Sequence, residues 1–218
     1  RTLASSCHIG HWRLHLSPLG TVRGRTRITG NTDGSELIPA HLQSYQAHRV
    51  AIVVLGDLGS SPRIQYHARS LADAGAAVDL VGYVKTELVD AVQNHPMIKI
   101  HALRPPSAAN NSRRRHRLLF VLRSIVRVSQ DTIQLTWALL FSLRRPDTVF
   151  VQNPPSVPTL LVALVVARLR SARFVIDWHN YGYTMIALRL GQRSPLVLLH
   201  EWLERTCGGK ADHHLCVS

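Results

Sequence analysis

The stretch RVAIVVLGDLGSSPRIQYHARSLA, residues Arg49 to Ala72, decides the fold of this chain. It begins with an apolar run of strand length, Val50 to Leu55, and continues into a short turn that contains glycines. After Pro62, apolar residues recur at helical spacing, so the stretch predicts a strand, a glycine turn and a helix. Ser61 is expected to cap that helix, because its hydroxyl can accept a hydrogen bond from a free backbone N–H.

The turn between this strand and this helix is a candidate anion site. Glycines let the backbone turn tightly and approach a ligand closely, and the free N–H groups at a helix N-terminus favour negative charge. The turn lacks the third glycine of a dinucleotide fingerprint and the lysine of a P-loop. Two interpretations therefore stay open, an ordinary strand-to-helix turn or one wall of a ligand site.

Strands and helices alternate along the rest of the chain. The expected elements are a strand at Ala76 to Tyr83, a short helix at Glu87 to Gln93, a strand at Ile98 to Leu103, a strand at Val149 to Val151, a helix at Val157 to Arg170 and a strand at Phe174 to Ile176. This alternation is typical of parallel βαβ units. We therefore predict an α/β fold, a Rossmann-like doubly wound parallel sheet, which binds ligands at the carboxyl ends of its strands.

Composition limits the class of protein. The 218 residues are 45% apolar, enough for one sizeable core, and 26 Lys and Arg against 13 Asp and Glu give a net charge of +13. That charge predicts anionic partners, but no zinc-finger, RNA-recognition or basic-heptad motif points to nucleic acid.

The three cysteines lack metal or disulfide spacing, and the group of His213, His214 and Cys216 has no second cluster beside it. We expect no metal site and a reducing compartment.

Two segments stand apart from the predicted domain core. Residues Arg1 to His48 lack any sustained apolar period and are expected to be a disordered or non-native leader, with an organelle transit peptide as the alternative. The folded domain is expected to comprise residues 49–218. Within it, Arg113 to Arg145 holds eight arginines and one acid.

This basic segment is expected to be an amphipathic helix. Its polar residues fall at helical steps: His116, Arg123, Arg127, Gln130, Asp131 and Gln134. A membrane-spanning helix needs ~20 uninterrupted apolar residues, and the longest uncharged run, Thr132 to Leu143, is shorter. The segment is therefore predicted to lie on an anionic bilayer with Trp137 at the interface, or to be a core helix with a solvated basic face.

Polar residues follow three of the predicted strands, and parallel strands bring such ends to one edge of the sheet. Asp57 follows the first strand, and Asp177 and His179 follow the last. A carboxylate or an imidazole can act as a general base towards a hydroxyl, so these three are the candidate bases. The structural alternatives are that Asp177 caps a helix and that His179 is an ordinary histidine with its hydrogen bonds satisfied.

The same strand ends carry candidate binding groups. Asn153 and Asn180 offer amide hydrogen bonds, while Trp178, Tyr181 and Tyr183 offer flat surfaces for a sugar ring. Trp178 has a structural alternative as a core residue. The coincidence of such residues at three strand ends favours a ligand site.

Three motifs, GDLGSSPRIQYHARSLA, FVQNPPSVPTL and FVIDWHNYGYT, resemble in order and spacing the amino-terminal half of the chitobiosyldiphosphodolichol beta-mannosyltransferase family, which includes a plant relative with similar motifs. The resemblance covers Arg49 to Ser218, and the closing ADHHLCVS is similar to the family's sixth strand. It implies the amino-terminal, acceptor-side domain of a GT-B glycosyltransferase. The carboxyl-terminal donor domain of that fold is absent from this sequence, so the chain alone is expected to be inactive.

The resemblance implies an inverting transfer of mannose from GDP-mannose to dolichol-diphosphate-linked chitobiose (GlcNAc2-diphosphodolichol) in N-glycan precursor assembly. It implies that the protein is located at the cytosolic face of the endoplasmic reticulum membrane. It also implies that the enzyme uses no cofactor and that the missing domain binds most of the donor. The basic segment Arg113 to Arg145 would contact the anionic membrane surface, and other glycosyltransferases of the assembly are expected partners. A counterpart of the amino-terminal membrane anchor of animal and fungal members is not expected in this sequence.

By motif position the implied base is Asp57 or His179, with Asp177 behind them. The implied substrate-binding residues are Gly56, Gly59, Ser60, Arg63, Asn153, Trp178, Asn180 and Tyr181. Two alternatives to an enzyme fragment remain: a non-catalytic truncated paralogue that acts as a membrane-docked interaction module, and, more weakly, a nucleic-acid binder driven by charge.

Overall fold

The computed structural model describes residues 48–105 and 117–216, and no side chain of residues 117–124. The expected leader, apart from His48, lies outside the described residues. The strands are β1 (Arg49–Asp57), β2 (Ala77–Tyr83), β3 (Ile98–Leu103), β4 (Thr148–Asn153), β5 (Arg173–Trp178) and β6 (His213–Cys216). The helices are α1 (Pro62–Asp73), α2 (Asp90–Gln93), α3 (Arg117–Trp137), which continues as the π-helical η2 (Ala138–Ser142), α4 (Thr159–Arg170), α5 (Gly182–Leu190) and α6 (Pro195–Gly208).

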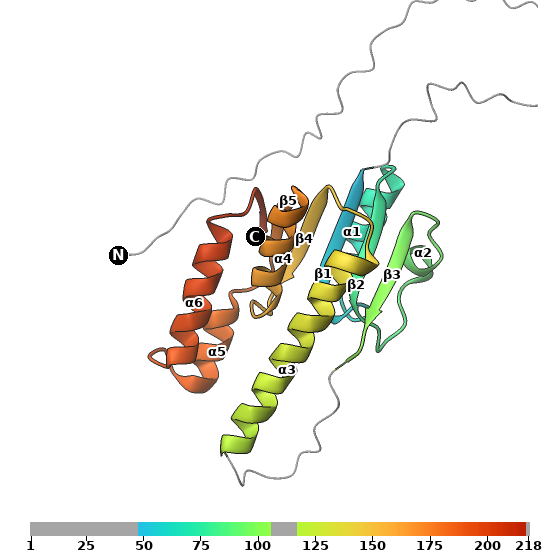
Figure 1. Cartoon of the computed structure of the whole chain (residues 1–218). Helices are drawn as coiled ribbons and strands as arrows, with labels where there is room; N and C mark the ends of the chain where they lie inside the picture. The colour runs from blue at the N-terminus through green and yellow to red at the C-terminus, as the bar shows by residue number, and fades with distance from the viewer. Residues whose placement is uncertain (1–47, 106–116, 217–218) are drawn as a thin grey trace, which may run out of the picture. The chain divides into compact units, whose positions relative to one another are not determined.

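The six strands form one parallel sheet in the order β3-β2-β1-β4-β5-β6 (Figure 1). The chain starts near the middle at β1, builds outward to β3, and then returns to the other side of β1 with β4. The order of the strands therefore reverses between β1 and β4, and crevices at such a point are where open α/β sheets bind ligands. The predicted α/β fold class, a Rossmann-like doubly wound parallel sheet, is confirmed.

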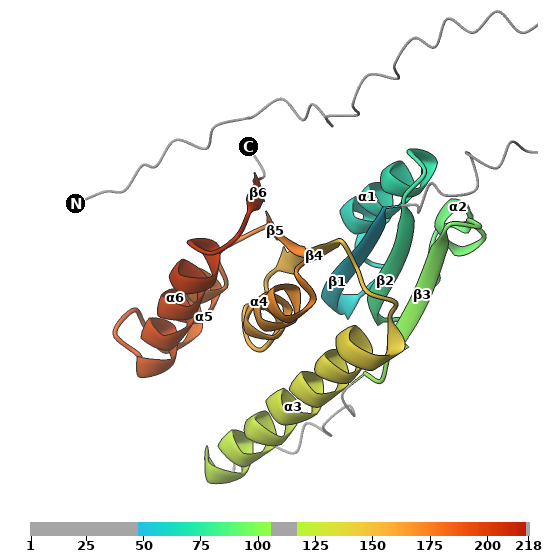
Figure 2. The ribbon, with the colours of Figure 1, turned by 45° about the horizontal axis from the view of Figure 1, so that its top comes forward.

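Helices cover both faces of the sheet, so the central strands are apolar on both sides (Figure 2). On one face, α1 packs through Ile64 and Ala68 against alternate residues of β1 such as Ile52. On the other face, α4 and the end of α3 pack against the intervening residues, such as Val53. Successive strand residues point to opposite faces, which explains why Val50 to Leu55 is an unbroken apolar run.

Three local expectations differ from the structure. The predicted cap is wrong, because the Ser61 hydroxyl donates to Asp57 O at 2.9 Å rather than accepting from the helix. The helix expected at Glu87 to Gln93 is shorter, because α2 begins only at Asp90. Helices α5 and α6, which follow β5, had no counterpart among the predicted elements.

The basic segment forms a helix whose polar residues do not all face solvent. Asp131 is 6% exposed and accepts a hydrogen bond from the Tyr83 hydroxyl at 2.7 Å, whereas Ile133 and Phe141 are each 67% exposed. The carboxyl half of α3 packs on the sheet through Leu135. Arg113 to His116 lie outside the described residues. Within the described helices, none is both long and apolar enough to cross a membrane.

Candidate functional site

The carboxyl edge of the sheet gathers the ends of β1, β4 and β5. In register, Gln152 of β4 lies beside Asp177 of β5, and Asn153 lies beside Trp178. The ends of these strands are joined by the backbone N–H of His179, which donates to Asn153 O at 2.9 Å. The predicted motifs of β4 and β5 therefore lie side by side at this edge. We call the stretch formed by residues 152–153 and 177–179 the rim.

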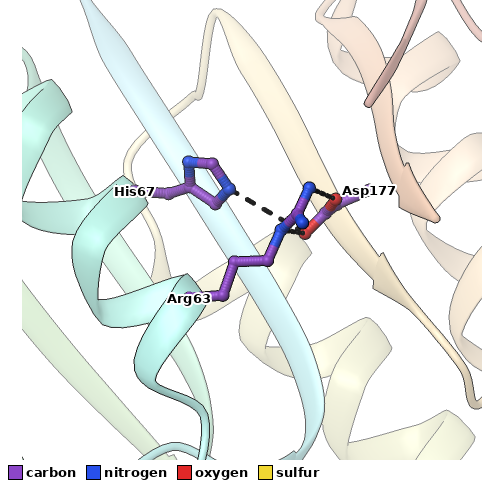
Figure 3. Close-up of polar contacts among 3 residues, drawn as sticks. All are labelled: Arg63, His67 and Asp177. Atoms are coloured by element: carbon purple, nitrogen blue, oxygen red, sulfur yellow. Dashed lines mark hydrogen bonds and ion pairs between the residues drawn. The ribbon is translucent and has the colours of Figure 1, made fainter. Parts of the chain in front are cut away.

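A buried ion pair crosses from α1 to the rim (Figure 3). Arg63 donates from Nε to Asp177 Oδ2 at 3.0 Å and from Nη2 to Asp177 Oδ1 at 2.7 Å. The Asp177 side chain is 0% exposed, whereas that of Arg63 is 30% exposed. The bidentate pair uses one edge of the guanidinium and leaves Nη1 out of it, so part of a positive charge remains open to solvent beside the rim.

His67 completes this group. It lies one helical turn after Arg63, and its Nε2 is 3.9 Å from Asp177 Oδ2 (Figure 3). Burial lowers the pKa of His67 below its usual 6.5; the Asp177 carboxylate opposes that shift and the Arg63 cation adds to it. At neutral pH the face of α1 that meets Asp177 therefore holds one neutral imidazole and one compensated ion pair.

Asp57, at the end of β1, is bound to the neighbouring loop after β2. Its carboxylate accepts hydrogen bonds from the Thr86 hydroxyl at 2.7 Å and from the backbone N–H groups of Lys85 at 2.8 Å and Thr86 at 3.3 Å. The Thr86 hydroxyl and the Lys85 N–H lower the pKa of Asp57 to about 2. Such a carboxylate holds a proton weakly, and its geometry is that of a group that shapes the β1–α1 turn.

The turn itself is held from inside by Gln65. Its Nε2 donates to Leu58 O and Gly59 O, both at 3.0 Å, and its Oε1 accepts from Val89 N at 2.8 Å. Gly59 lies so close to the loop after β2 that an added Cβ would come within 2.6 Å of Glu87 O. The turn needs a glycine here because of this close approach of backbone to backbone.

A second buried carboxylate, Glu204 of α6, ties the rim to the helices that follow it. It is 2% exposed. Its Oε1 accepts from Gly182 N at 2.8 Å, from Asn153 Nδ2 at 3.4 Å, and from the Ser156 hydroxyl. Burial raises the pKa of Glu204 above its usual 4.5, although the hydrogen bonds oppose that shift. Asn153, itself 0% exposed, thus acts within the protein and not towards solvent.

Aromatic rings run along the outer part of the rim. The ring centroids of Trp178 and Tyr181 are 5.5 Å apart, those of Tyr181 and Tyr183 are 5.6 Å apart, and the Trp178 indole N–H donates to His214 Nδ1 at 2.9 Å. Tyr181 is 54% exposed. This row of rings, which we call the aromatic ledge, offers the kind of flat apolar surface that sugars stack on.

The predicted site residues thus fall into two groups. Arg63 and Asp177 are brought into direct contact, and Trp178 and Tyr181 share the aromatic ledge, with His179 and Asn180 exposed beside them. Of the others, Gly56 lies in β1, while Asp57, Gly59, Ser60 and Asn153 bond to neighbouring parts of the chain. Ser60 Oγ donates to Asp57 O at 3.2 Å. The described residues contain no group of three or more His, Cys, Asp or Glu side chains placed to hold a metal ion.

His67 and Glu204 are the site residues that sequence reasoning missed. His67 was detectable, because it stands four residues after Arg63 and therefore on the same face of the predicted helix. Glu204 follows the end of the third motif by twenty residues, in a helix that was not predicted. Only the folded chain brings it to Asn153 and Gly182.

The chain is similar to known glycosyltransferases. The family model for the glycosyl transferase 4-like domain matches residues 59–218. UDP-glycosyltransferase TURAN of Arabidopsis thaliana is 43% identical over 171 residues, which cover 78% of this chain and 36% of that protein. Among the solved structures, Phytolacca americana UGT2 complexed with UDP-2fluoro-glucose and pterostilbene matches with a TM-score of 0.37 and 13% identity, over 60% of this chain and 30% of that one.

Other curated relatives carry the name predicted from the motifs. The chitobiosyldiphosphodolichol beta-mannosyltransferase of Yarrowia lipolytica is 44% identical over 172 residues, covering 78% of this chain and 36% of that protein. The protein of the same name from Homo sapiens is 38% identical over 173 residues, covering 79% and 36%. The resemblance drawn from the motifs is thereby confirmed. The chain spans 36% of the length of these relatives.

Proposed function

Since this chain belongs to the glycosyl transferase 4-like domain family, we propose that it forms the acceptor-side half of a β-1,4-mannosyltransferase. The reaction is transfer of mannose from GDP-mannose to GlcNAc2-diphosphodolichol, with inversion at the sugar carbon. The observation that carries the proposal is the identity of 44% to a relative named as the beta-mannosyltransferase of chitobiosyldiphosphodolichol. The family match also includes the α1 side of the site and both strand ends of the rim.

The acceptor needs a cationic group for its diphosphate and a flat surface for its sugars. Arg63 supplies the first, because its guanidinium is fixed by Asp177 while 30% of its side chain stays exposed. The aromatic ledge supplies the second, through the exposed ring of Tyr181. An arginine that is already held in one geometry loses little conformational freedom when it binds a phosphate oxygen. The pair with Asp177 therefore favours binding of the acceptor diphosphate by Arg63.

Inversion requires a base that removes the proton of the attacking acceptor hydroxyl. Of the three candidates, Asp177 is buried in its pair with Arg63, and Asp57 is held by Thr86 and Lys85 with a pKa of about 2. His179 is exposed at the rim, next to the aromatic ledge. We therefore assign His179 as the base, with Asp57 and Asp177 in positioning roles.

We assign the donor and the membrane contact as follows. No cofactor takes part. This chain matches 36% of the length of its relatives, and GDP-mannose is bound mainly by a part of the enzyme outside that matched region. The Arg113 to Arg145 segment contacts the anionic lipid surface on the cytosolic side of the endoplasmic reticulum, where other glycosyltransferases of N-glycan assembly act. Exposed Trp137 and Phe141 on α3 and η2 support a lipid contact.

A transfer assay tests this function. The full-length enzyme that contains this chain is incubated with GDP-mannose and a phytanyl-linked GlcNAc2 diphosphate, and the product is analysed by β-mannosidase digestion. His179→Ala should lower kcat by at least about a hundredfold, the usual effect of losing a general base. The control is His95→Ala. His95 lies at the amino end of β3, the outermost strand on the side of the sheet away from β5.

The outcomes separate the function from the residue assignment. Failure of the wild-type enzyme to mannosylate this acceptor would contradict the function and favour a membrane-docked module without catalysis. Full activity of the folded His179→Ala variant would contradict only the choice of base. Loss of activity in Asp57→Ala but not in His179→Ala would move the base to Asp57.

A further inference from the structure

The helices on the two sides of the α5–α6 turn carry large apolar side chains that nothing in the described part of the chain covers. Leu188 is 90% exposed, Leu196 is 54% exposed and Leu199 is 48% exposed. On α6, Leu196, Leu199 and Trp202 are three residues apart and share one face, and Trp202 is 59% exposed. We call these four residues with Leu190 the hairpin tip.

The opposite face of the hairpin explains why the tip is turned outward. Val197 and Cys207 of α6 are 3% and 1% exposed, and Cys207 belongs to the core on the α4 side of the sheet. Glu204, on the same inward side, accepts the hydrogen bond from Gly182 at the start of α5. Packing and the buried hydrogen bond therefore fix which residues of the two helices face away from the domain.

Charge along the hairpin from Trp178 to His200 has a single sign. Arg189 is exposed near the end of α5 and Arg193 is exposed in the turn, and the sequence from Trp178 to His200 contains no Asp or Glu. The first acid after it, Glu201, is paired with Arg205 at 2.7 Å. Leucines interspersed with arginines and bordered by a tryptophan are typical of a surface that meets lipid head groups and the upper part of their acyl chains.

The hairpin projects from the edge of the domain. In Figure 1 the turn between α5 and α6 lies at the end of the two helices farthest from the sheet, and α5 begins directly after the carboxyl end of β5. The amino end of α3 projects on the same side in Figure 1. The projecting turn is therefore free to approach a membrane, and it lies at the carboxyl edge of the sheet, where β5 leads into the aromatic ledge.

We propose that the hairpin tip inserts into the interfacial layer of an anionic phospholipid bilayer. Leu188, Leu196 and Leu199 enter the acyl boundary, while Arg189 and Arg193 bind lipid phosphates. The inference adds a second element to the lipid contact of α3, and it holds whether or not the chain takes part in mannosyl transfer. A two-fold contact between two copies through this tip is disfavoured, because it brings the arginines of both copies together.

Binding of the full chain to vesicles tests the inference. Vesicles of phosphatidylcholine with phosphatidylserine are sedimented with the wild type, with Leu188→Asp/Leu199→Asp, and with Tyr66→Asp/Leu169→Asp as control. The control positions are 70% and 68% exposed on α1 and α4, so they match in exposure and in added charge. The tip variant should lower the partition coefficient by about tenfold or more, since it replaces inserted leucines by carboxylates, and the control by about twofold at most from charge alone.

Trp202 reports insertion directly. Brominated lipids should quench part of the tryptophan fluorescence of the wild type, and Trp202→Phe should remove a part that Trp137→Phe does not. Melting curves confirm that each variant is folded. Equal loss of binding in tip and control variants, or no vesicle binding by the wild type, would overturn the inference. So would a dimer in solution that Leu188→Asp/Leu199→Asp dissociates while vesicle binding is unchanged.

Discussion

Arg63 and Asp177 show how a buried charge is kept in this protein. The carboxylate has no contact with water, so its charge is tolerated only because two hydrogen bonds from one guanidinium compensate it. The pair also orients Arg63 towards the rim. One interaction therefore serves both the stability of the α1–β5 contact and the placement of a cation at the proposed acceptor site.

Arg63→Ala is expected to lower the free energy of unfolding by about 3–5 kcal/mol, because it leaves the buried Asp177 carboxylate without its bidentate partner. The comparison is Arg69→Ala, which breaks an exposed pair with Asp73 on the same helix and should cost about 0–1 kcal/mol. Urea unfolding followed by circular dichroism measures both. Equal losses in the two variants would show that the buried pair has no special role.

Titration of His67 should make stability depend on pH. Burial lowers its folded pKa below 6.5, so the unfolded chain binds more protons than the folded one when the pH falls through that value. The contribution of neutral His67 to stability is therefore fully present above about pH 6.5 and is lost towards acid.

Asp177 and Arg63 are the charged groups that face the same ring. His67→Gln should flatten the fall in unfolding free energy between about pH 7 and pH 5. Urea titrations at several pH values measure this slope, with His179→Gln, an exposed histidine, as control. An unchanged slope in His67→Gln would mean that other groups cause the acid sensitivity.

Among the elements, the α5–α6 hairpin depends on one glycine. Gly182 starts α5 where Glu204 of α6 and Ser156 of the preceding loop converge, and an added Cβ would lie 2.7 Å from Glu204 Oε1 and 2.6 Å from Ser156 Oγ. Neither neighbour can retreat without breaking the buried hydrogen bonds that hold the rim. The position therefore needs glycine for space and not for backbone conformation.

Gly182→Ala is expected to destabilise the protein by about 1–3 kcal/mol, the usual cost of overpacking. Gly56→Ala is the matched control, since its Cβ would meet only Val54 Cγ1 at an ordinary 3.4 Å. Thermal or urea unfolding compares the two. A Gly182→Ala variant as stable as the control would show that α5 can move away from Glu204 at little cost.

The helix α3 illustrates what a periodic pattern leaves undecided. Polar residues at helical steps predicted a helix correctly, but residues 125–130 are exposed on every side, whereas Asp131 is buried against Tyr83. The prediction from this pattern holds only if the whole length of the helix packs on one surface. In the structure only the carboxyl half lies on the sheet, because the amino half extends beyond the domain (Figure 2).

Over the whole molecule, the charge of +13 should govern any contact with lipid. Binding of the full chain to anionic vesicles is expected to fall at least about tenfold between 0.05 M and 0.5 M NaCl, because salt screens charges on an exposed surface. Vesicle sedimentation measures this, with phosphatidylcholine vesicles as the neutral reference. Binding that is insensitive to salt would indicate that apolar insertion alone drives the contact.

The sequence by itself determined the alternation of strands and helices, the parallel sheet, the family and the three motifs at the carboxyl edge. These follow from local periodicity and from glycine, proline and polar residues that act over a few positions. The tertiary structure alone decided that Asp57 is bound by Thr86, that Arg63 compensates Asp177, and that Glu204 joins α6 to Asn153 and Gly182. Each of these contacts joins residues more than twenty positions apart, and such pairing depends on how the elements pack, which periodicity does not encode.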